Sequence, residues 1–244
     1  MTPGMTPAPR SAMVLAAGLG TRLRPLTDRV PKPLIEVAGR PLIEHALDRL
    51  AAAGVERTVV NLHYKGELIA ARLAGRARPR IAFSREAELL ETGGGVRRAL
   101  PLLDEAFFVV NGDVLWSDGA VPSLDRLARA FDPARMDALL LLQPRAGAVG
   151  YEGRGDYFLA APGVPRRRGA DAAAPYIFGG IQILHRRLFA GTEEAAFSLK
   201  RLYDRAEDAG RLGALVHDGG WFHVGTPEGL AATRARFAIA PAAG

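Results

Sequence analysis

The chain has 244 residues, of which 48% are hydrophobic, and a formal net charge of +6. This length and composition suit one large α/β domain or two small ones with a sizeable core. There is no cysteine, which excludes disulfides and thiolate zinc sites. No apolar run approaches the roughly 18 residues that span a bilayer, and the N-terminus lacks the basic-then-apolar order of a signal peptide. We therefore expect a cytoplasmic protein that does not bind membranes.

The positive charge raises the question of nucleic-acid binding. The arginines are scattered through every segment, and the only tight basic run is Arg166-Arg167-Arg168, in a loop bounded by Gly and Pro. No aromatic residues are interleaved with that run to stack bases. We therefore expect small anionic substrates rather than nucleic acid. The role of the 166–168 loop and the oligomeric state stay open.

Strand-like and helix-like segments alternate between two terminal segments, residues 1–10 and 241–244, which we expect to be disordered tails. The alternation is typical of a mainly parallel sheet covered by helices. The predicted strands, in chain order, are 12–16, 58–61, 81–84, 107–111, 138–143, 157–160, 176–184, 212–216 and 221–224. The predicted helices are 41–53, 65–73, 121–130, 199–209 and 227–239. Strand 107–111 is almost entirely apolar, which predicts a central position in the sheet.

The helix at 41–53 has the clearest start and stop signals. Pro41 stands in its first turn and Gly54 follows its last, which are the positions that these two residues favour. Its apolar residues fall along one face: Leu42, Ile43, Ala46, Leu47 and Leu50. The pattern predicts a helix that packs one side against the sheet.

A glycine-rich loop follows the first predicted strand. Gly18 and Gly20 stand at the carboxyl end of that strand, where glycines let backbone N–H groups approach a phosphate. Open α/β sheets bind ligands at that end of their strands. Arg22 can donate two parallel hydrogen bonds to phosphate oxygens. Lys32 supplies a compact charge between two prolines, whose rings stiffen its backbone. The segment 15–34 therefore predicts a phosphate-binding loop.

Two other phosphate-binding motifs do not fit these glycines. The dinucleotide fingerprint opens directly into a helix and needs an acidic residue at the end of the next strand. Here a proline-punctuated loop delays the helix to Pro41, and the second strand ends at Asn61. A Walker A loop is excluded because no Gly-Lys-Ser/Thr occurs. A dehydrogenase is accordingly disfavoured.

The segment 15–34 resembles the signature of the nucleotidyltransferases that activate sugar 1-phosphates. Further segments agree with it: 90–95 (Leu-Glu-Thr-Gly-Gly-Gly) resembles the base-recognition loop, 111–113 (Asn-Gly-Asp) the metal-binding turn, and 221–227 (Trp-Phe-His-Val-Gly-Thr-Pro) the C-terminal metal segment. These motifs cover nearly the whole chain. Within the family, segments 91–95 and 154–157 are most similar to the N-acetylmuramate-1-phosphate uridylyltransferases of bacterial cell-wall recycling.

The resemblance implies a single Rossmann-like α/β domain, residues 11–240, with a mainly parallel (mixed) central sheet flanked by helices. A nucleotide-binding half would span 11–120 and a sugar-phosphate half 121–240. The implied reaction transfers UMP from UTP to N-acetylmuramate 1-phosphate and releases pyrophosphate, with Mg²⁺, or alternatively Mn²⁺, as cofactor.

The same resemblance assigns roles to individual residues. The catalytic residues would be Arg22 and Lys32, and the metal ligands Asp113 and His223. The residues that it places around the nucleotide are Leu15, Ala16, Ala17, Gly18, Gly20, Thr21, Glu86, Thr92 and Gly93. Those that it places around the sugar are Asn111, Asp156 and Gly180.

Elementary chemistry agrees with several of these roles and leaves alternatives to others. Asp113 follows a buried strand and a flexible Asn-Gly pair, so its carboxylate can reach Mg²⁺ on a triphosphate, although it could merely cap the next turn. Thr92 and Gly93 precede a helix, where a hydroxyl and backbone groups could read a base edge, yet capping alone explains Thr92. Glu86 lies near the base or is an ordinary exposed glutamate.

His223 departs from the family pattern, because the Trp-x-Asp-x-Gly-Thr form of the segment supplies a second carboxylate at this position. Mg²⁺ prefers oxygen ligands, and imidazole suits softer metals better. The histidine could ligate Mn²⁺ or Co²⁺, contact phosphate, or be a bystander. We favour a phosphate-facing or weakly ligating role.

Three other functions compete with this interpretation. Within the enzyme class, the alternative is a guanylyltransferase acting on mannose or heptose 1-phosphate. A non-catalytic sugar-nucleotide-sensing subunit on the same fold is disfavoured by the presence of Arg22, Lys32 and Asp113. The dehydrogenase is disfavoured by the failed fingerprint. The expected partners are a nucleoside triphosphate and a sugar 1-phosphate.

Overall fold

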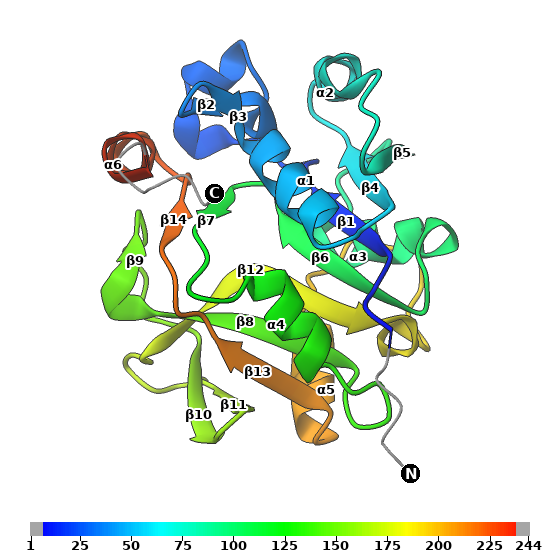
Figure 1. Cartoon of the computed structure of the whole chain (residues 1–244), viewed down its shortest axis with the longest axis vertical. Coiled ribbons are helices and arrows are strands. Elements are labelled where there is room, and N and C mark those ends of the chain that lie inside the picture. Colours follow the sequence, from blue (N-terminus) through cyan, green and yellow to red (C-terminus); the bar gives the residue numbers. More distant parts are fainter. Residues whose placement is uncertain (1–6, 238–244) are drawn as a thin grey trace.

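The computed structural model describes residues 7–237 and shows a central sheet with helices on both faces (Figure 1). The first half of the chain supplies four strands that pair in parallel. In spatial order they are β5 (Arg80–Arg85), β4 (Arg57–Leu62), β1 (Ser11–Leu15) and β6 (Ala106–Asn111). Parallel strands share one carboxyl edge, so the segments that follow β1, β4 and β6 meet there.

The second half of the chain extends the same sheet through antiparallel pairs. The long strand β12 (Tyr176–His185) runs antiparallel to β6 on one side and to β8 (Ala138–Pro144) on the other. The remaining strands of this half are β13 (Leu212–Val216), which is parallel to β8, and the hairpin β10 (Tyr157–Ala161) and β11 (Val164–Arg167), which joins the start of β12. The predicted α/β fold with a mixed sheet is therefore confirmed.

Alternating residues along the strands pack against two helical layers. Ala12 and Val14 of β1 face a core shared with α1 (Leu42–Ala52), α2 (Gly66–Leu73) and α4 (Ser123–Ala130). Met13, between them, faces a second core shared with α3 (Glu91–Ala99) and α5 (Lys200–Asp208). Figure 1 shows α1 and α4 in front of the sheet. Two buried faces explain why the central strands are apolar throughout.

A small second sheet brings the end of the chain to the carboxyl edge of the main sheet. Its strands are β7 (Val114–Trp116), β14 (Trp221–His223) and β9 (Ala148–Val149). Helix α6 (Pro227–Phe237) follows β14, and Leu230 packs with Leu23, Ile35 and Phe222. The C-terminal segment is thereby held against the loop after β1.

The predicted strands and helices all correspond to observed elements with closely similar bounds. The predictions gave no bounds for α3, which begins at Glu91 and so includes Thr92 and Gly93, which were expected to precede it. They also missed five short strands: the pair β2 (Glu36–Val37) and β3 (Arg40–Pro41), together with β7, β9 and β11. Strands of two to four residues have no periodicity of their own and are defined by a partner elsewhere in the chain. The predicted end of the last helix, 238–239, and the tail at 241–244 lie outside the described residues.

The N-terminal boundary differs from the prediction of a disordered tail through residue 10. Residues 1–6 lie outside the described part, but residues 7–10 belong to it. The carbonyl of Arg10 accepts hydrogen bonds from the N–H groups of Glu56 and Arg57, and its guanidinium pairs with the Glu56 carboxylate. Arg10, which precedes β1, is therefore bound to the folded domain.

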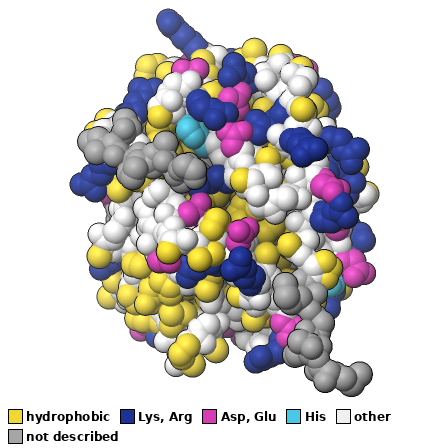
Figure 2. Space-filling view, viewed as in Figure 1, with side chains coloured by type: hydrophobic (Ala, Val, Ile, Leu, Met, Phe, Trp, Pro, Cys, Tyr) yellow, Lys and Arg dark blue, Asp and Glu magenta, His cyan; other side chains and the backbone are white. Residues whose placement is uncertain are grey.

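The surface shows how the excess of arginine is arranged. On the face seen in Figure 2, basic side chains are dispersed among acidic ones. The 166–168 run follows this pattern, because Arg166 pairs with Asp171 and Arg167 with Asp204. Among residues 7–237, no helix combines the length and apolar character needed to cross a bilayer.

Candidate active site

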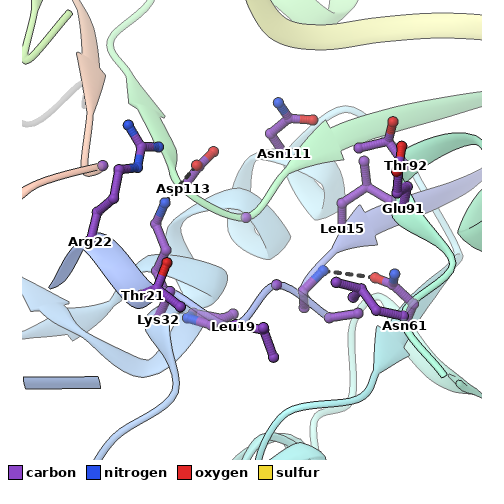
Figure 3. A pocket seen from close by; sticks show the side chains of 18 residues that line it. Leu15, Leu19, Thr21, Arg22, Lys32, Asn61, Glu91, Thr92, Asn111 and Asp113 are labelled. Carbon is purple, nitrogen blue, oxygen red and sulfur yellow. Dashed lines mark hydrogen bonds and ion pairs between the residues drawn. The ribbon is translucent and has the colours of Figure 1, made fainter. Parts of the chain in front are cut away.

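A cleft of about 430 Å³ opens at the carboxyl edge of the parallel strands (Figure 3). Its volume lies in the range of small-molecule sites. The segments that follow β1, β5 and β6 form its walls, together with Asn61 near the end of β4, the start of α3 and one residue of the C-terminal segment. The lining residues are Leu15, Ala16, Ala17, Gly18, Leu19, Gly20, Thr21, Arg22, Lys32, Pro33, Asn61, Leu89, Glu91, Thr92, Asn111, Gly112, Asp113 and Gly225.

The loop after β1 forms one wall, as the sequence predicted. Gly20 has a positive φ of 64°, and a Cβ there would lie 2.9 Å from Cγ2 of Thr27. The Thr27 hydroxyl donates to the Gly20 carbonyl and holds this turn. At Gly18, by contrast, a Cβ would meet nothing within 4 Å, so that glycine leaves open space above the loop. Such a loop lets a ligand approach the backbone closely.

Two cationic side chains reach this wall from short 3₁₀ turns. Arg22 belongs to the turn Thr21–Leu23, is exposed, and forms no ion pair within residues 7–237. Lys32 begins the turn Lys32–Leu34, and its side chain is 13% exposed. In Figure 3 both cationic groups point toward Asp113. Arg22 is thus free to meet an anion, whereas Lys32 already has a partner.

That partner is Asp113, which lies in the turn between β6 and β7. Its Oδ2 accepts a hydrogen bond from Nζ of Lys32 at 2.6 Å. The preceding Gly112 passes so close to the Leu15 carbonyl that a Cβ would lie 2.6 Å from that oxygen. Burial alone would raise the pKa of Asp113, but the charge of Lys32 and the contact with His223 outweigh burial and hold that pKa well below its usual range. The carboxylate is therefore ionised at neutral pH.

His223 reaches Asp113 because of the second sheet. Strand β14 pairs with β7 so that His223 stands opposite Val114, and the Val224 N–H donates to the Asp113 carbonyl. Nε2 of His223 then lies 3.4 Å from Oδ2 of Asp113, and Nδ1 of His223 lies 3.3 Å from the Gly150 carbonyl. The predicted pair of metal-site residues is brought together, although His223 is not among the residues that line the cleft.

The donor set at Asp113 fits a cation that takes most of its ligands from elsewhere. Within residues 7–237 no group of three or more His, Cys, Asp or Glu side chains is placed to hold a metal. Asp113 is 27% exposed and lines the cleft, and both recorded contacts of its carboxylate use Oδ2, leaving Oδ1 for another ligand. Mg²⁺ commonly binds through one or two carboxylates, substrate phosphates and water. The site suits that mode and not a closed protein cage.

The segment 90–95, which resembles a base-recognition loop, holds Thr92 and Gly93 in contacts that the sequence did not predict. Thr92 lines the cleft, but its hydroxyl accepts the Leu199 N–H and so does not cap its own helix. Gly93 does not line the cleft, because its N–H donates to the carbonyl of Phe197. A Cβ at Gly93 would lie 2.3 Å from the Phe197 ring. The glycines thus accommodate a segment that precedes α5, a partner that only the tertiary fold reveals.

Glu86 also lies outside the lining of the cleft. It is only 5% exposed. Its carboxylate accepts from Nδ2 of Asn61 at 2.7 Å and from the Leu90 N–H at 3.1 Å. Asn61 does line the cleft, and sequence reasoning treated it only as the end of a strand. A polar residue ending a buried strand at the ligand edge was the signal that could have identified it.

Of the three residues expected around the sugar, one lines the cleft and two lie outside its lining. Asn111 lines the cleft beside Asp113. Gly180 does not line it but lies directly behind Asn111, since a Cβ at Gly180 would lie 3.0 Å from the Asn111 Nδ2. Asp156 is also outside the lining, and its carboxylate accepts the Phe178 N–H next to the irregularity in β12. Gly180 therefore supports the wall that holds Asn111, and Asp156 binds the backbone of β12, the strand that contains Gly180.

The assembled cleft has the chemistry of a polyphosphate site. It combines glycine backbone, two cations and the ionised carboxylate of Asp113 at the edge where open α/β sheets bind ligands, with Glu91 on the opposite wall. Its lining, as the described residues form it, contains no serine, cysteine or histidine that could serve as an activated nucleophile. The arrangement suits the direct transfer of a phosphorus group between two anions, with charge stabilisation from Arg22 and Lys32.

Comparison with known proteins shows relatives of this chain. The nucleotidyl transferase family model matches residues 11–151. The chain is 45% identical over 242 residues to the N-acetylmuramate alpha-1-phosphate uridylyltransferase of Caulobacter vibrioides, covering 97% of this chain and 100% of the relative. It is 37% identical over 220 residues to the protein of that name from Neisseria meningitidis, covering 88% and 93%.

The fold also matches solved structures. HddC from Yersinia pseudotuberculosis, complexed with GMP-PN, superposes with a TM-score of 0.76, covering 93% of this chain and 99% of that chain at 22% identity. At this identity the likeness concerns the fold alone.

Proposed function

The chain belongs to the nucleotidyl transferase family and is a sugar-1-phosphate nucleotidyltransferase, and on this premise we propose that it makes UDP-N-acetylmuramate from UTP and N-acetylmuramate 1-phosphate. The observation that carries the choice of substrates is the 45% identity to the Caulobacter vibrioides relative over the full length of both chains. The proposal includes a cytoplasmic setting and a part in recycling cell-wall sugars, which follow from these substrates.

The cleft supports a single displacement at phosphorus. An oxygen of the sugar 1-phosphate forms a bond to the α-phosphorus of UTP. The bond from that phosphorus to its β-bridging oxygen breaks, and pyrophosphate leaves with the electron pair. The attacking phosphate is already an anion, so the reaction needs no general base. The described lining of the cleft agrees with this, since it contains no histidine to act as a base and no serine or cysteine to act as an activated nucleophile.

Catalysis then depends on alignment and charge. The loop at Gly18 and Gly20 receives the triphosphate, whose negative charge would otherwise repel the incoming phosphate. Arg22 is exposed and free of ion pairs in the described chain, so it can donate to the transferring phosphate or to the departing pyrophosphate. Lys32, held by its turn and by Asp113, supplies a second positive charge at a fixed place.

The proposal assigns Mg²⁺ to Asp113, with Mn²⁺ as the alternative. Bound there, the cation would neutralise phosphate oxygens and help orient the triphosphate. Asp113 would hold it through the carboxylate oxygen that Lys32 does not use. His223 lies close enough to contact the same ion or a phosphate, and we favour that minor role for it.

One experiment tests the reaction and its substrates together. The purified chain is incubated with five nucleoside triphosphates against a panel of sugar 1-phosphates, with and without Mg²⁺, and pyrophosphate release is followed. We expect the highest kcat/KM for UTP with N-acetylmuramate 1-phosphate. Preference for GTP with mannose or heptose 1-phosphate would overturn the substrate assignment and leave the reaction class intact.

A further inference from the structure

A buried chain of hydrogen bonds connects the two ends of the nucleotide cleft. The Ala16 N–H donates to Oδ1 of Asn61 at 2.7 Å, and Nδ2 of Asn61 donates to Oε1 of Glu86 at 2.7 Å. The Leu90 N–H donates to Oε2 of Glu86 at 3.1 Å. Ala16 lies in the phosphate loop after β1, and Leu90 lies between two residues of the opposite wall, Leu89 and Glu91. Two side chains therefore join walls that belong to separate segments.

The order of donors and acceptors in this series of hydrogen bonds is fully determined. Both ends are backbone N–H groups, which can only donate. Ala16 therefore orients the Asn61 amide, so that its NH₂ group faces Glu86. A carboxylate at Glu86 accepts from both sides, from Asn61 and from Leu90. Between the N–H groups of Ala16 and Leu90, one amide and one carboxylate satisfy every hydrogen bond. Two amides would leave two donors facing each other, and two carboxylates would leave two acceptors facing each other.

The surroundings give this pair little freedom to rearrange. Asn61 is 3% exposed and Glu86 is 5% exposed. Helix α3 packs directly on them, since a Cβ at Gly95 would lie 2.8 Å from Oε1 of Glu86 and 3.1 Å from Nδ2 of Asn61. The ring of His63 also contacts the Glu86 carbonyl, at 3.0 Å from its Nδ1. A buried, satisfied polar network of this kind specifies one arrangement of the segments that it joins.

We infer that Asn61 and Glu86 are positioning residues that hold the phosphate loop and the base end of the cleft at one separation, and that Glu86 acts through Asn61 and Leu90 without contacting the nucleotide. The inference rests on the proposed function only in taking a nucleoside triphosphate as the ligand of this cleft. Breaking the pair should weaken nucleotide binding, while leaving the charged groups at Arg22 and Lys32 in place.

The decisive variant exchanges the two functional groups. In Asn61→Asp two carboxylates face each other, and in Glu86→Gln an NH₂ group faces either Asn61 or the Leu90 N–H. In the double variant Asn61→Asp/Glu86→Gln every bond can reform: the carboxylate at position 61 accepts from Ala16 and from the amide at position 86, whose oxygen accepts from Leu90. Total charge and the number of hydrogen bonds stay the same.

Steady-state kinetics and thermal unfolding are measured for both single variants and the double variant. We expect each single variant to raise the KM for the nucleotide roughly tenfold or more, with a smaller change in kcat, because an unsatisfied buried polar group costs about 1–3 kcal/mol. We expect the double variant to return to within about threefold of the wild-type KM. Tyr203→Phe removes a different buried hydrogen bond, to Gln182, and serves as the matched control that lowers Tm without moving KM.

Gly95→Ala tests the same pair without altering its polar groups, because the added methyl pushes against both side chains. It should raise the nucleotide KM as the single variants do. A double variant that folds but keeps the raised KM of Glu86→Gln would show that the restored hydrogen bonds do not set nucleotide binding, and would overturn the inference. Wild-type KM in both single variants would overturn it as well. If a single variant does not fold, the double variant alone decides between these outcomes.

The measurement also separates this inference from the proposed substrates. All variants are assayed with whichever nucleoside triphosphate the wild-type protein prefers. A preference for GTP would remove the uridylyltransferase assignment, whereas the comparison of the single and double variants would stand unchanged.

Discussion

Lys32 and Asp113, 81 residues apart in the sequence, form an ion pair whose Nζ–Oδ2 distance is 2.6 Å. The lysine stands in the phosphate loop and the aspartate in the turn that follows the central strand β6. The pair places a cation for phosphate next to a carboxylate for a metal ion. Lys32 therefore keeps the Asp113 carboxylate ionised before a triphosphate and a divalent cation bind.

Replacing the carboxylate tests whether Asp113 is the principal metal ligand. We expect Asp113→Asn to abolish nearly all Mg²⁺-dependent turnover, since the amide keeps the shape but loses the charge that binds a hard cation. Pyrophosphate release over a Mg²⁺ titration, with Tm measured alongside, provides the check. Turnover and apparent Mg²⁺ affinity close to wild type would show that the cation is held elsewhere.

Removing each cation separates transition-state stabilisation from substrate binding. Arg22→Ala and Lys32→Ala should each reduce kcat by about 10²–10³, the usual cost of one lost electrostatic contact to a reacting group. The KM values should change less, because the contact strengthens as charge builds on the transferring phosphate. Near-normal kcat with a raised KM would instead mark uniform binding of substrate and transition state.

The two cations should differ in the pH dependence of their variants. Burial raises the pKa of Asp113, and Lys32 with His223 lowers it by more. Without Lys32 the pKa of Asp113 rises, so the carboxylate is protonated, and cation binding lost, at a higher pH than in the wild type. The acid limb of log kcat/KM should therefore move to higher pH in Lys32→Ala. Arg22→Ala, which removes a cation not paired with Asp113, is the control and should keep the wild-type limb. Identical acid limbs in both variants would contradict this electrostatic coupling.

His223 can be tested by restoring the carboxylate of the family pattern. We expect His223→Asp to remain active and to bind Mg²⁺ more tightly, because Nε2 already lies 3.4 Å from Oδ2 of Asp113 and an oxygen ligand suits Mg²⁺ better. His223→Ala should weaken the response to Mg²⁺. The measurement is turnover over a titration with Mg²⁺ and with Mn²⁺. Unchanged affinity and rate in both variants would place this histidine outside the metal site.

Gly180 should affect the sugar end of the cleft through its neighbour. The residue has φ of 75°, and a Cβ there would lie 3.0 Å from Nδ2 of Asn111. Gly180→Ala should lower the free energy of unfolding by about 1 kcal/mol and raise the KM for the sugar 1-phosphate more than that for the nucleotide. Gly163→Ala is the matched control: it has φ of 77°, and its nearest contact would be the Ala214 carbonyl at 3.6 Å. Equal KM values in the two variants would remove Asn111 from sugar binding.

Part of the candidate site could be predicted because it depends on local signals. An apolar strand followed by glycines or by an Asn-Gly turn places the next residues at the carboxyl edge of a sheet, whatever the rest of the chain does. Arg22, Lys32 and Asp113 all follow this rule, and all three line the cleft. Glu86, Gly93 and Asp156 lie outside the lining, where hydrogen bonds to Asn61, Phe197 and Phe178 hold them.

The amino-acid sequence by itself determined the alternation of strands and helices, the phosphate loop after the first strand and the aspartate after the central one. These follow from periodicity and turn chemistry, which act between residues a few positions apart. Only the tertiary structure decided which distant groups meet. The pairing of β14 with β7 brings His223 to Asp113, and the parallel order of β1, β4 and β5 brings Asn61 between Ala16 and Glu86. The partner of a buried hydrogen bond is set by how whole strands and helices pack, and no local pattern records that arrangement.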